Sequence, residues 1–549
     1  MLYSSHASVY RSATSPRESF GFQRGAAETL HSRVFGAFVN AGCKIGYIRP
    51  CMRPHLQPAF PCLAVFFRVC QSVDFVNILW ADRVCPPFLE LEETMLNLTN
   101  KSIRELIDPR GFDCECGKHH AVNIAYIKTG RGAIKCVPEM VRALGAERPF
   151  VLCDENTYRA AGERVCHILK DADIEYTLLV LPVEKPAPDE HTVGNVIMRF
   201  DMRCDLVLGV GSGVINDTCK EIGYKTGRKN AIVGTAPSMD GFASATSSME
   251  LDHVKVSLNN QCPQGILLDS DILAQAPMRM LWAGFGDMVA KYIGICEWRI
   301  AHLITGEYYC EAVAELVRSA LRKIMAQADK ITSRDPDVIG DIADGLVIAG
   351  LGMAFAGCSR PASGLEHYFS HMWEMMALDR GVPYDLHGIQ VGVGTVLCMK
   401  LYTYIRSLTP DRERMLAHAA AFDQAAWENQ VRAIFGKAAP EIERIERAQR
   451  KNDPERLRRR IDIICDHWAE IQEIIREELP EVDALLSVMR ETGMPMKPSD
   501  IDISVDDVVN AYLGARDIRD KYLSCSMLWD MGLEKEAAEY LRGAVSEKN

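Results

Sequence analysis

One aspartate and three histidines stand in otherwise apolar segments of the second half of the chain: Asp287, His367, His371 and His387. One carboxylate and two imidazoles can hold a catalytic divalent metal ion while leaving a coordination position open. His367 and His371 are four residues apart and therefore share one helix face, so spacing leaves open which of them is the ligand. A structural role for each histidine, and an i,i+4 ion pair of Asp287 with Lys291, are the alternatives.

A second polar cluster, Cys114-x-Cys116-Gly-Lys-His119-His120, resembles part of a metal site. No second pair of ligands follows at the spacing of a zinc finger or ribbon. We therefore do not predict a metal site from this pattern alone.

Two glycine-containing turns are candidates for binding a phosphorylated cofactor. Residues 209–217 (GVGSGVIND) follow a predicted strand and open a predicted helix, whose free N–H groups attract a pyrophosphate. The third glycine of G-x-G-x-x-G is missing and no G-K-[ST] follows, so neither a Rossmann fingerprint nor a Walker A loop is present. Residues 234–241 end the next strand, and Thr235, Ser238 and Ser244 offer small hydroxyl groups. The alternative for both segments is turn formation alone.

Alternating strands and helices must position these turns. Five short apolar runs predict buried parallel strands: 149–153, 176–183, 205–210, 231–234 and 265–269. Helix-length segments such as 157–171 and 214–228 lie between them, which predicts an open α/β sheet.

The second half of the chain reads as helices. After Asp271 the strand signals nearly vanish, and helices are predicted at 275–304, 307–331, 340–357, 363–378 and 387–407. We predict an α/β dinucleotide-binding domain over 95–271 and an all-α metal-binding, catalytic domain over 272–549. A ligand cleft between the two domains is expected.

Composition excludes several classes of partner. The chain has 549 residues, 48% hydrophobic and 25% charged, with a net charge of −12, which disfavours non-specific binding to nucleic acid or anionic lipid. Its 19 cysteines are scattered, as expected for reduced, cytoplasmic thiols. No uninterrupted apolar run is long enough to predict a membrane span.

The first 94 residues differ from the rest. Residues 1–89 carry nine basic and four acidic residues, a net of +5, so the remainder carries −17. They show no clear periodicity, and we expect them to be disordered. A transit-like extension is one interpretation; we favour a non-native stretch from a start codon chosen upstream, with Met95 as the natural start.

Five motifs occur in an order that carries a resemblance: Gly211 to Lys220 (GSGVINDTCK), Thr235 to Gly241 (TAPSMDG), Gly286 to Lys291 (GDMVAK), Ser363 to His371 (SGLEHYFSH) and His387 to Gly392 (HGIQVG). Together they resemble the iron-containing alcohol dehydrogenase / dehydroquinate synthase / glycerol dehydrogenase superfamily over about residues 95 to 530. Within it, the pattern is most similar to the sn-glycerol-1-phosphate dehydrogenase family in its longer bacterial form. Ser212 departs from the commonest G-G-G loop.

The resemblance implies a dehydroquinate synthase-like fold and roles for particular residues. It assigns one divalent metal ion, Zn²⁺ or Ni²⁺, to Asp287, His367 and His387, and substrate contact to Asp240 and His371. It implies that NAD or NADP is bound by the glycine loop and the following turn. With Asp154, discussed next, the predicted cofactor residues are Asp154, Gly211, Gly213, Val214, Ile215, Asn216, Asp217, Thr235, Ser238 and Ser244.

Asp154 ends the first predicted strand of the α/β domain. A carboxylate at such a strand end commonly approaches the adenosine ribose and would favour NADH over NADPH. The alternative is that Asp154 caps the helix that follows.

The activity that the resemblance implies is the reversible reduction of dihydroxyacetone phosphate to sn-glycerol 1-phosphate, for glycerophosphate and lipid-precursor metabolism. It also implies a homo-oligomer, namely a dimer. Donors for the substrate phosphate are not evident, and Lys291 is a candidate only if it does not pair with an acid. The alternatives are a glycerol or other polyol dehydrogenase, a lyase of the dehydroquinate synthase type, and a non-catalytic metal or nucleotide sensor.

Overall fold

The computed structural model describes residues 98–182, 186–251 and 254–546, all of which belong to one compact unit that spans Val84–Asn549. The predicted extension over 1–94 and the predicted start at Met95 lie outside the described residues.

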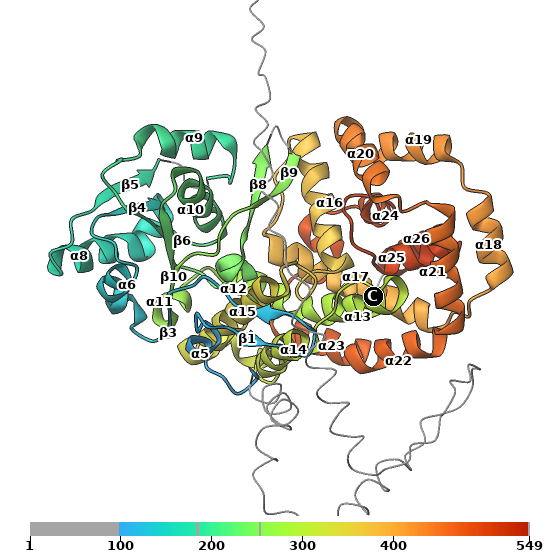
Figure 1. Cartoon of the computed structure of the whole chain (residues 1–549), viewed down its shortest axis with the longest axis horizontal. Helices are drawn as coiled ribbons and strands as arrows, with labels where there is room; N and C mark the ends of the chain where they lie inside the picture. Colours follow the sequence, from blue (N-terminus) through green and yellow to red (C-terminus); the bar gives the residue numbers. More distant parts are fainter. Residues whose placement is uncertain (1–97, 183–185, 252–253, 547–549) are drawn as a thin grey trace, which may run out of the picture. The chain divides into compact units, whose positions relative to one another are not determined.

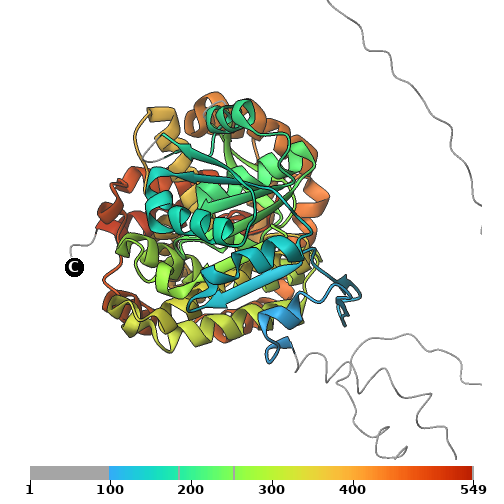
Figure 2. The same ribbon diagram turned by 90° about the vertical axis from the view of Figure 1, so that its left-hand side faces the viewer.

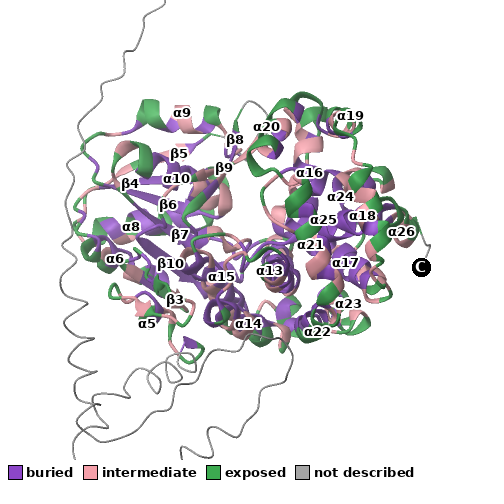
Figure 3. Cartoon of the chain, turned by 45° about the vertical axis from the view of Figure 1, so that its right-hand side comes forward, coloured by how far each residue is buried: buried purple, intermediate pink, exposed green. Residues whose placement is uncertain are grey.

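A parallel six-stranded sheet forms the first half of the described chain (Figure 1). Its strands are β3 (Tyr126–Gly130), β4 (Pro149–Asp154), β5 (Thr177–Leu181), β6 (Leu206–Gly211), β7 (Lys229–Gly234) and β10 (Gly265–Asp269). Every pair of neighbours in the order β3-β10-β7-β6-β4-β5 is parallel. The central strands are buried along almost their whole length (Figure 3), as continuous apolar runs covered on both faces must be.

Helices connect the strands and surround the sheet (Figure 2). They are α6 (Val137–Ala143), α7 (Glu155–Thr157), α8 (Glu163–Asp171), α9 (Glu190–Arg199) and α10 (Gly213–Thr226). From β4 the chain first adds β5 on one side and then crosses to β6 on the other. This change of direction opens a crevice at the carboxyl ends of β4 and β6, where open α/β sheets bind ligands.

Two short antiparallel hairpins flank the sheet. One consists of β1 (Phe112–Asp113) and β2 (His119–His120) after the first described helix, α5 (Ile103–Leu106). The other consists of β8 (Thr246–Leu251) and β9 (Val254–Asn259), and β9 packs against a helix of the second half, α16 (Leu365–Arg380).

All five predicted strands are present, but the prediction missed β3. This strand lies at the sheet edge, where only Ile127 is buried and Lys128 is exposed, so it lacks the apolar run that marked the others. Asp154 therefore ends the second strand of the sheet and not the first.

After β10 every element is a helix, which confirms the predicted succession of an α/β part and a helical part. The helices that carry the site are α11 (Ser270–Leu273), α12 (Met278–Val289), α13 (Lys291–Thr305), α14 (Glu311–Met325), α15 (Pro336–Ala356), α16 and α17 (His387–Arg406). Those that follow are α18 (Arg412–Ala420), α19 (Gln424–Phe435), α20 (Ala439–Gln449), α21 (Pro454–Asp466), α22 (Trp468–Glu478), α23 (Val482–Glu491), α24 (Val505–Ala515), α25 (Ser524–Asp530) and α26 (Glu534–Ser546).

The single helix predicted over 275–304 is wrong, because the chain ends α12 and begins α13 around Ala290. Apolar residues continue through the break, so the pattern does not mark it. The break places Lys291 at the start of α13, one turn after Asp287.

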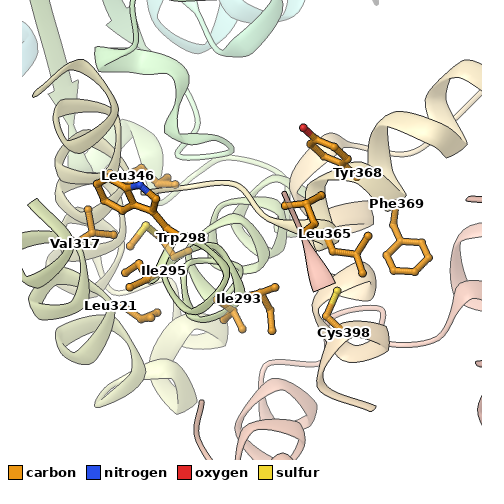
Figure 4. Close-up of a cluster of buried hydrophobic side chains, with 14 of the residues drawn as sticks. Ile293, Ile295, Trp298, Val317, Leu321, Leu346, Leu365, Tyr368, Phe369 and Cys398 are labelled. Carbon is orange, nitrogen blue, oxygen red and sulfur yellow. The ribbon is translucent and has the colours of Figure 1, made fainter. Parts of the chain in front are cut away.

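The helical part has a continuous apolar core. Figure 4 shows side chains from five of its helices: Ile293, Ile295, Trp298, Val317, Leu321, Leu346, Leu365, Tyr368, Phe369 and Cys398. Among the described residues one helix, α15, is long and apolar enough to cross a membrane by length and composition, but 67% of its apolar window is buried inside the protein, as in a core helix.

Candidate active site

A cavity of about 1640 Å³ runs along the carboxyl edge of the sheet and against the helices of the second half. It exceeds the roughly 300–1,000 Å³ that a drug-sized ligand occupies, so it has room for a dinucleotide and a small substrate together. Its wall includes the ends of β4, β6 and β7, the β8–β9 hairpin, α16, the start of α17, and the segment 519–521.

Most of the predicted cofactor residues line this cavity: Asp154, Gly213, Val214, Ile215, Asp217, Thr235, Ser238 and Ser244. Gly211 and Asn216 do not. Gly211 is the last residue of β6, and its carbonyl accepts the Thr235 amide at 3.0 Å. Asn216 is buried and donates from Nδ2 to the carbonyl of Gly241 at 3.1 Å. Both residues therefore shape the turns from behind the cavity wall.

Ser212 ties the two turns together. Its hydroxyl lies 2.7 Å from that of Ser238 and donates to the carbonyl of Ala236 at 3.1 Å. A glycine at this position could make neither bond. The serine that replaces the middle glycine of a G-G-G loop thus joins the two turns, and α10 still begins at Gly213.

The Asp-x-x-Lys end of the glycine loop is an internal brace. The buried Lys220 donates from Nζ to Asp217 Oδ1 at 3.0 Å, to the carbonyl of Gly241 at 2.7 Å and to that of Thr246 at 2.9 Å. Asp217 Oδ2 accepts the amide of Ser248 at 3.0 Å. These bonds hold α10, the second turn and the start of β8 in one arrangement.

Asp154 performs the capping role and also lines the cavity. Its Oδ1 accepts the Thr157 amide at 2.8 Å, and the Thr157 hydroxyl accepts the Asp154 amide at 2.9 Å, which closes a capping box at the start of α7. Because Asp154 is also part of the cavity wall, capping does not exclude contact with a cofactor.

Asp287 lies in a buried network with Asp240 and Lys291. Asp287 Oδ2 accepts the Asp240 amide at 2.8 Å, and Asp287 Oδ1 accepts from Lys291 Nζ at 3.1 Å. Lys291 also donates to Asp240 Oδ2 at 2.7 Å and to the carbonyl of Ala362 at 3.1 Å, so all three of its protons are used. Lys291 is therefore no donor for a substrate phosphate; the predicted pairing with an acid is present.

The charges of this network support one another. Burial alone would lower the pKa of Lys291, but Asp240 and Asp287 raise it above its ordinary value. Burial alone would raise the pKa of Asp287, but Lys291 and His367 hold it well below its usual range. Both groups are thus charged at neutral pH.

His367 lies between two carboxylates at the start of α16. Its Nε2 is 3.5 Å from Asp287 Oδ1, and its Nδ1 is 2.7 Å from Oε1 of Glu366. Glu366 Oε1 also accepts the amide of Gly364, so its side chain cannot turn away without losing a second bond. Burial opposes protonation of His367, but bonds with Asp287 and Glu366 raise its pKa.

His371 and His387 lie next to this network with a buried glutamate, Glu374. The rings of His367 and His387 are 5.2 Å apart, and those of His371 and His387 are stacked at 5.6 Å. His387 Nδ1 is 3.0 Å from the Ser370 hydroxyl and 3.4 Å from Glu374 Oε1. The ligand-capable atoms of His371, Glu374 and His387 lie within 4.8 Å of one another, as do those of Asp240, Asp287 and His367. The predicted metal ligands are thus divided between two adjacent groups, with Asp287 and His367 in one and His387 in the other.

Burial shifts the pKa values of this second group, and two of its polar atoms lack a hydrogen bond among the described residues. Burial, helped by the positive charge of Arg519, lowers the pKa of His371 well below its usual value, so its imidazole is neutral. Burial alone would raise the pKa of Glu374, but Lys255, His371 and His387 hold it well below the usual range. His371 Nδ1 and Glu374 Oε2 are buried without a hydrogen bond among the described residues. They lie 4.0 Å apart, and Glu374 Oε2 is 3.5 Å from Lys255 Nζ, so polar contacts hold them and leave hydrogen-bonding capacity for a ligand.

Positive charge gathers on the wall of the cavity near His371. Arg519 and Lys521 line it and follow α24 in sequence. Arg519 forms no ion pair with any residue that the structure describes. Lys521 donates to the carbonyls of Ser363 at 2.8 Å and Ser359 at 3.3 Å, and burial lowers its pKa to about 7. Arg360 also lines the cavity but is paired with Glu307.

The sequence analysis missed four of these residues: Glu366, Glu374, Arg519 and Lys521. A signal existed for the glutamates, since Glu366 precedes His367 and Glu374 follows His371 by three positions on the same buried helix. No local signal marks Arg519 or Lys521, because only the fold brings a segment near the end of the chain to α16.

Comparison with known proteins agrees with this architecture. The family described as iron-containing alcohol dehydrogenase matches residues 128–277. A probable glycerol dehydrogenase from Sinorhizobium meliloti superposes with a TM-score of 0.50 at 18% identity, over 76% of this chain and 98% of that one. Glycerol dehydrogenase from Schizosaccharomyces pombe gives a TM-score of 0.50 at 15% identity, over 76% and 90%. The fold is therefore that of iron-containing alcohol dehydrogenases, which confirms the predicted dehydroquinate synthase-like class.

Sequence relatives narrow the class. A glycerol-1-phosphate dehydrogenase [NAD(P)+] from Halalkalibacterium halodurans is 36% identical over 294 residues, 53% of this chain and 74% of that protein. One from Bacillus licheniformis is 29% identical over 424 residues, 76% of this chain and 92% of that protein. One from Hyperthermus butylicus is 32% identical over 278 residues, 50% of this chain and 77% of that protein. The chain belongs to the glycerol-1-phosphate dehydrogenase family.

Proposed function

We propose that the chain catalyses the reversible, metal-dependent and NAD(P)H-linked reduction of dihydroxyacetone phosphate to sn-glycerol 1-phosphate. The observation that supports this best is the content of one cavity. It joins the nucleotide crevice of the sheet, a buried cluster of aspartate, glutamate and histidine, and two basic side chains, Arg519 and Lys521, on either side of Asp520. Family membership supports the same oxidoreductase reaction.

Asp287, His367 and His387 would hold the metal ion. The residues fit such an ion in chemistry, since they supply one carboxylate and two imidazoles from three helices. His367 Nδ1 bonds to Glu366, and Nε2 therefore faces Asp287. Metal-binding histidines commonly have such a carboxylate on the nitrogen that does not bind the metal. When bound, the metal would act as a Lewis acid on the substrate ketone, and the nicotinamide would supply the hydride.

The protein's own groups would orient the substrate and move its proton. Neutral His371 lies one helical turn after His367 and can give or take a proton at the substrate oxygen. Lys291 holds Asp240 Oδ2, which leaves Oδ1 to accept a hydrogen bond from the terminal hydroxyl.

Arg519 and Lys521 would bind the substrate phosphate. Both line the cavity, and Arg519 contributes to the electrostatic environment of His371, so a phosphate held there lies near the reacting groups. Arginine forms paired hydrogen bonds with phosphate oxygens, and lysine adds a point charge. A polyol dehydrogenase would have no use for this cationic segment, which favours the phosphorylated substrate.

Finer assignments complete the proposal. The cofactor is NAD or NADP, bound by the predicted glycine loop and turn, and the metal is Zn²⁺ or Ni²⁺. The enzyme acts in the cytoplasm as a homodimer and supplies glycerol phosphate for phospholipid synthesis.

The test is NADH and NADPH oxidation with dihydroxyacetone phosphate, after metal removal and after addition of Zn²⁺ or Ni²⁺, with the configuration of the product determined. Activity that depends on metal and yields sn-glycerol 1-phosphate supports the proposal. Higher turnover of glycerol or dihydroxyacetone would identify a polyol dehydrogenase, and conversion of substrate without net NADH change would indicate a lyase.

A further inference from the structure

The β1–β2 hairpin places four ligand-capable side chains at one point, far from the active-site cluster in sequence. They are Cys114, Cys116, His120 and Cys310, whose sulfur and nitrogen atoms all lie within 4.8 Å of one another. Cys310 comes from the start of α14, 190 residues after His120. The sequence pattern showed no second ligand pair because the fourth ligand is a single distant cysteine.

The distances match a tetrahedral site. Cys114 Sγ and Cys310 Sγ are 3.6 Å apart, and His120 Nε2 is 3.2 Å from Cys116 Sγ and 3.6 Å from Cys310 Sγ. Zinc bonds of about 2.3 Å to sulfur and about 2.0 Å to nitrogen place tetrahedral S–S and S–N neighbours about 3.8 Å and about 3.5 Å apart.

The surroundings of His120 set its ring for coordination. Its Nδ1 donates to the carbonyl of Phe355 at 2.8 Å, so Nε2 is the ring nitrogen that faces the sulfurs. This is the outer contact that metal-bound histidines commonly have. The ring lies 5.2 Å from that of Phe112, and both His120 and Cys310 are 1% exposed, so the site is shielded from water on one side.

The cysteine turn is shaped to present its two sulfurs. Gly117 adopts a positive φ of 79° and its amide donates to the carbonyl of Cys114 at 2.9 Å, which closes the turn. The hydroxyl of Tyr308 lies 3.3 Å from Cys116 Sγ, within hydrogen-bond distance, and Lys118 Nζ lies 3.3 Å from the centroid of the Tyr308 ring. A hydrogen-bond donor beside a cysteine stabilises its thiolate, so the Tyr308 hydroxyl can donate to Cys116 when this cysteine binds a metal ion.

We propose that Cys114, Cys116, His120 and Cys310 bind a structural Zn²⁺ ion, separate from the catalytic metal. Four protein ligands close the coordination sphere and leave no position for a substrate, which distinguishes a structural from a catalytic zinc site. The ion joins the β1–β2 hairpin to the first turn of α14 and, through His120, to the last turn of α15. The segment after α15, Gly357 to Arg360, lines the active-site cavity, so the site fixes one part of the cavity wall from outside.

Metal content of the purified full-length enzyme, measured by elemental mass spectrometry in reducing buffer, tests this directly. We expect two equivalents per chain in the wild type, one in Cys114→Ser, one in His367→Ala, and two in Cys136→Ser, a partly exposed cysteine outside the cluster. Cys114→Ser should also unfold at a lower temperature than Cys136→Ser. A wild-type metal content that Cys114→Ser leaves unchanged would overturn the proposal.

Cobalt substitution gives a second measurement, the absorption spectrum, which can be made on the wild type without any substitution in the cluster. Co²⁺-loaded wild type should show intense thiolate-to-cobalt charge-transfer absorption, which a site of carboxylate and imidazoles cannot give. The bands should persist in His367→Ala, a variant outside the cluster. Their absence from the wild type, or a Cys114–Cys310 disulfide in freshly isolated protein, would contradict the proposal. The structural site does not depend on the proposed function. A wild type with one metal equivalent per chain and intact thiolate bands would count against the catalytic metal only.

Discussion

The imidazole of His367 donates from Nδ1 to Oε1 of Glu366, 2.7 Å away, and this bond fixes the direction in which Nε2 points. Because both residues are buried, neither can exchange its partner for water without leaving a polar group unpaired. Glu366 is therefore a positioning residue for the proposed metal ligand.

Glu366→Gln should weaken metal binding by about 10–100-fold, since outer partners of metal-bound histidines have effects of this size. The measurement is metal affinity by competition with a chelator. Glu374→Gln is the comparison variant, because this buried glutamate of α16 lies 3.4 Å from the other proposed histidine ligand, His387. If Glu374→Gln loses metal and Glu366→Gln keeps it, the ion is bound by His371, Glu374 and His387, the other group that the fold brings together.

The two histidines of α16 should behave differently. His367→Ala should lose the catalytic metal and nearly all turnover. His371→Ala should keep the metal and lose about 10²–10⁴-fold in kcat, the usual contribution of a general acid or base. Metal content and kcat measured on the same preparations separate the two roles. Equal metal loss in both variants would make His371 a ligand, or would show that the helix itself is disturbed.

These residues also show how far the sequence predicts the fold and site. Buried parallel strands are continuous apolar runs, so five of six were found, whereas the half-exposed edge strand β3 was not. Motif order located Asp287, His367, His387 and the glycine turns. Arg519 and Cys310 could not be found in this way, because no neighbouring residue in the sequence indicates which distant residues they approach. Contacts between distant segments depend on packing, which local patterns do not contain.

Arg519→Ala should raise KM for dihydroxyacetone phosphate by about 10–100-fold, as loss of hydrogen bonds to a charged group costs about 1.5–3 kcal/mol. Turnover of unphosphorylated dihydroxyacetone should stay unchanged. Arg519→Lys should recover part of the affinity, and the exposed Arg432→Ala should have no effect. Equal losses for both substrates would show that Arg519 supports the site without contacting the phosphate.

Lys521 should give the preference for phosphate a pH dependence. Its pKa lies near 7 and not near the usual lysine value, because it is buried beside Arg360 and Arg519. In the free enzyme it is positively charged below about pH 7 and becomes neutral above it. The ratio of kcat/KM for dihydroxyacetone phosphate over dihydroxyacetone should therefore fall as pH rises through this value. Lys521→Arg, which stays charged, should flatten the change; a ratio that does not vary with pH in the wild type would exclude Lys521 from phosphate binding.

Asp154 allows cofactor choice to be tested apart from folding. Its carboxylate caps α7 through the Thr157 amide and also lines the cavity at the end of β4, on one side of the crevice between β4 and β6. A carboxylate at this position would accept hydrogen bonds from the ribose hydroxyls of NADH and would repel the 2′-phosphate of NADPH.

Asp154→Ser separates these two roles, because serine is also a good N-cap residue but carries no charge. We expect the wild type to prefer NADH, and the variant to use NADPH better while its unfolding midpoint changes little. The measurement is kcat/KM for both cofactors in both proteins, alongside thermal unfolding. Asp154→Ala serves as the control that removes the cap and the charge together, and it should cost about 1 kcal/mol of stability. If the ratio of kcat/KM values is the same in the wild type and in Asp154→Ser, the carboxylate acts only as a helix cap, and cofactor choice must be made elsewhere along the crevice.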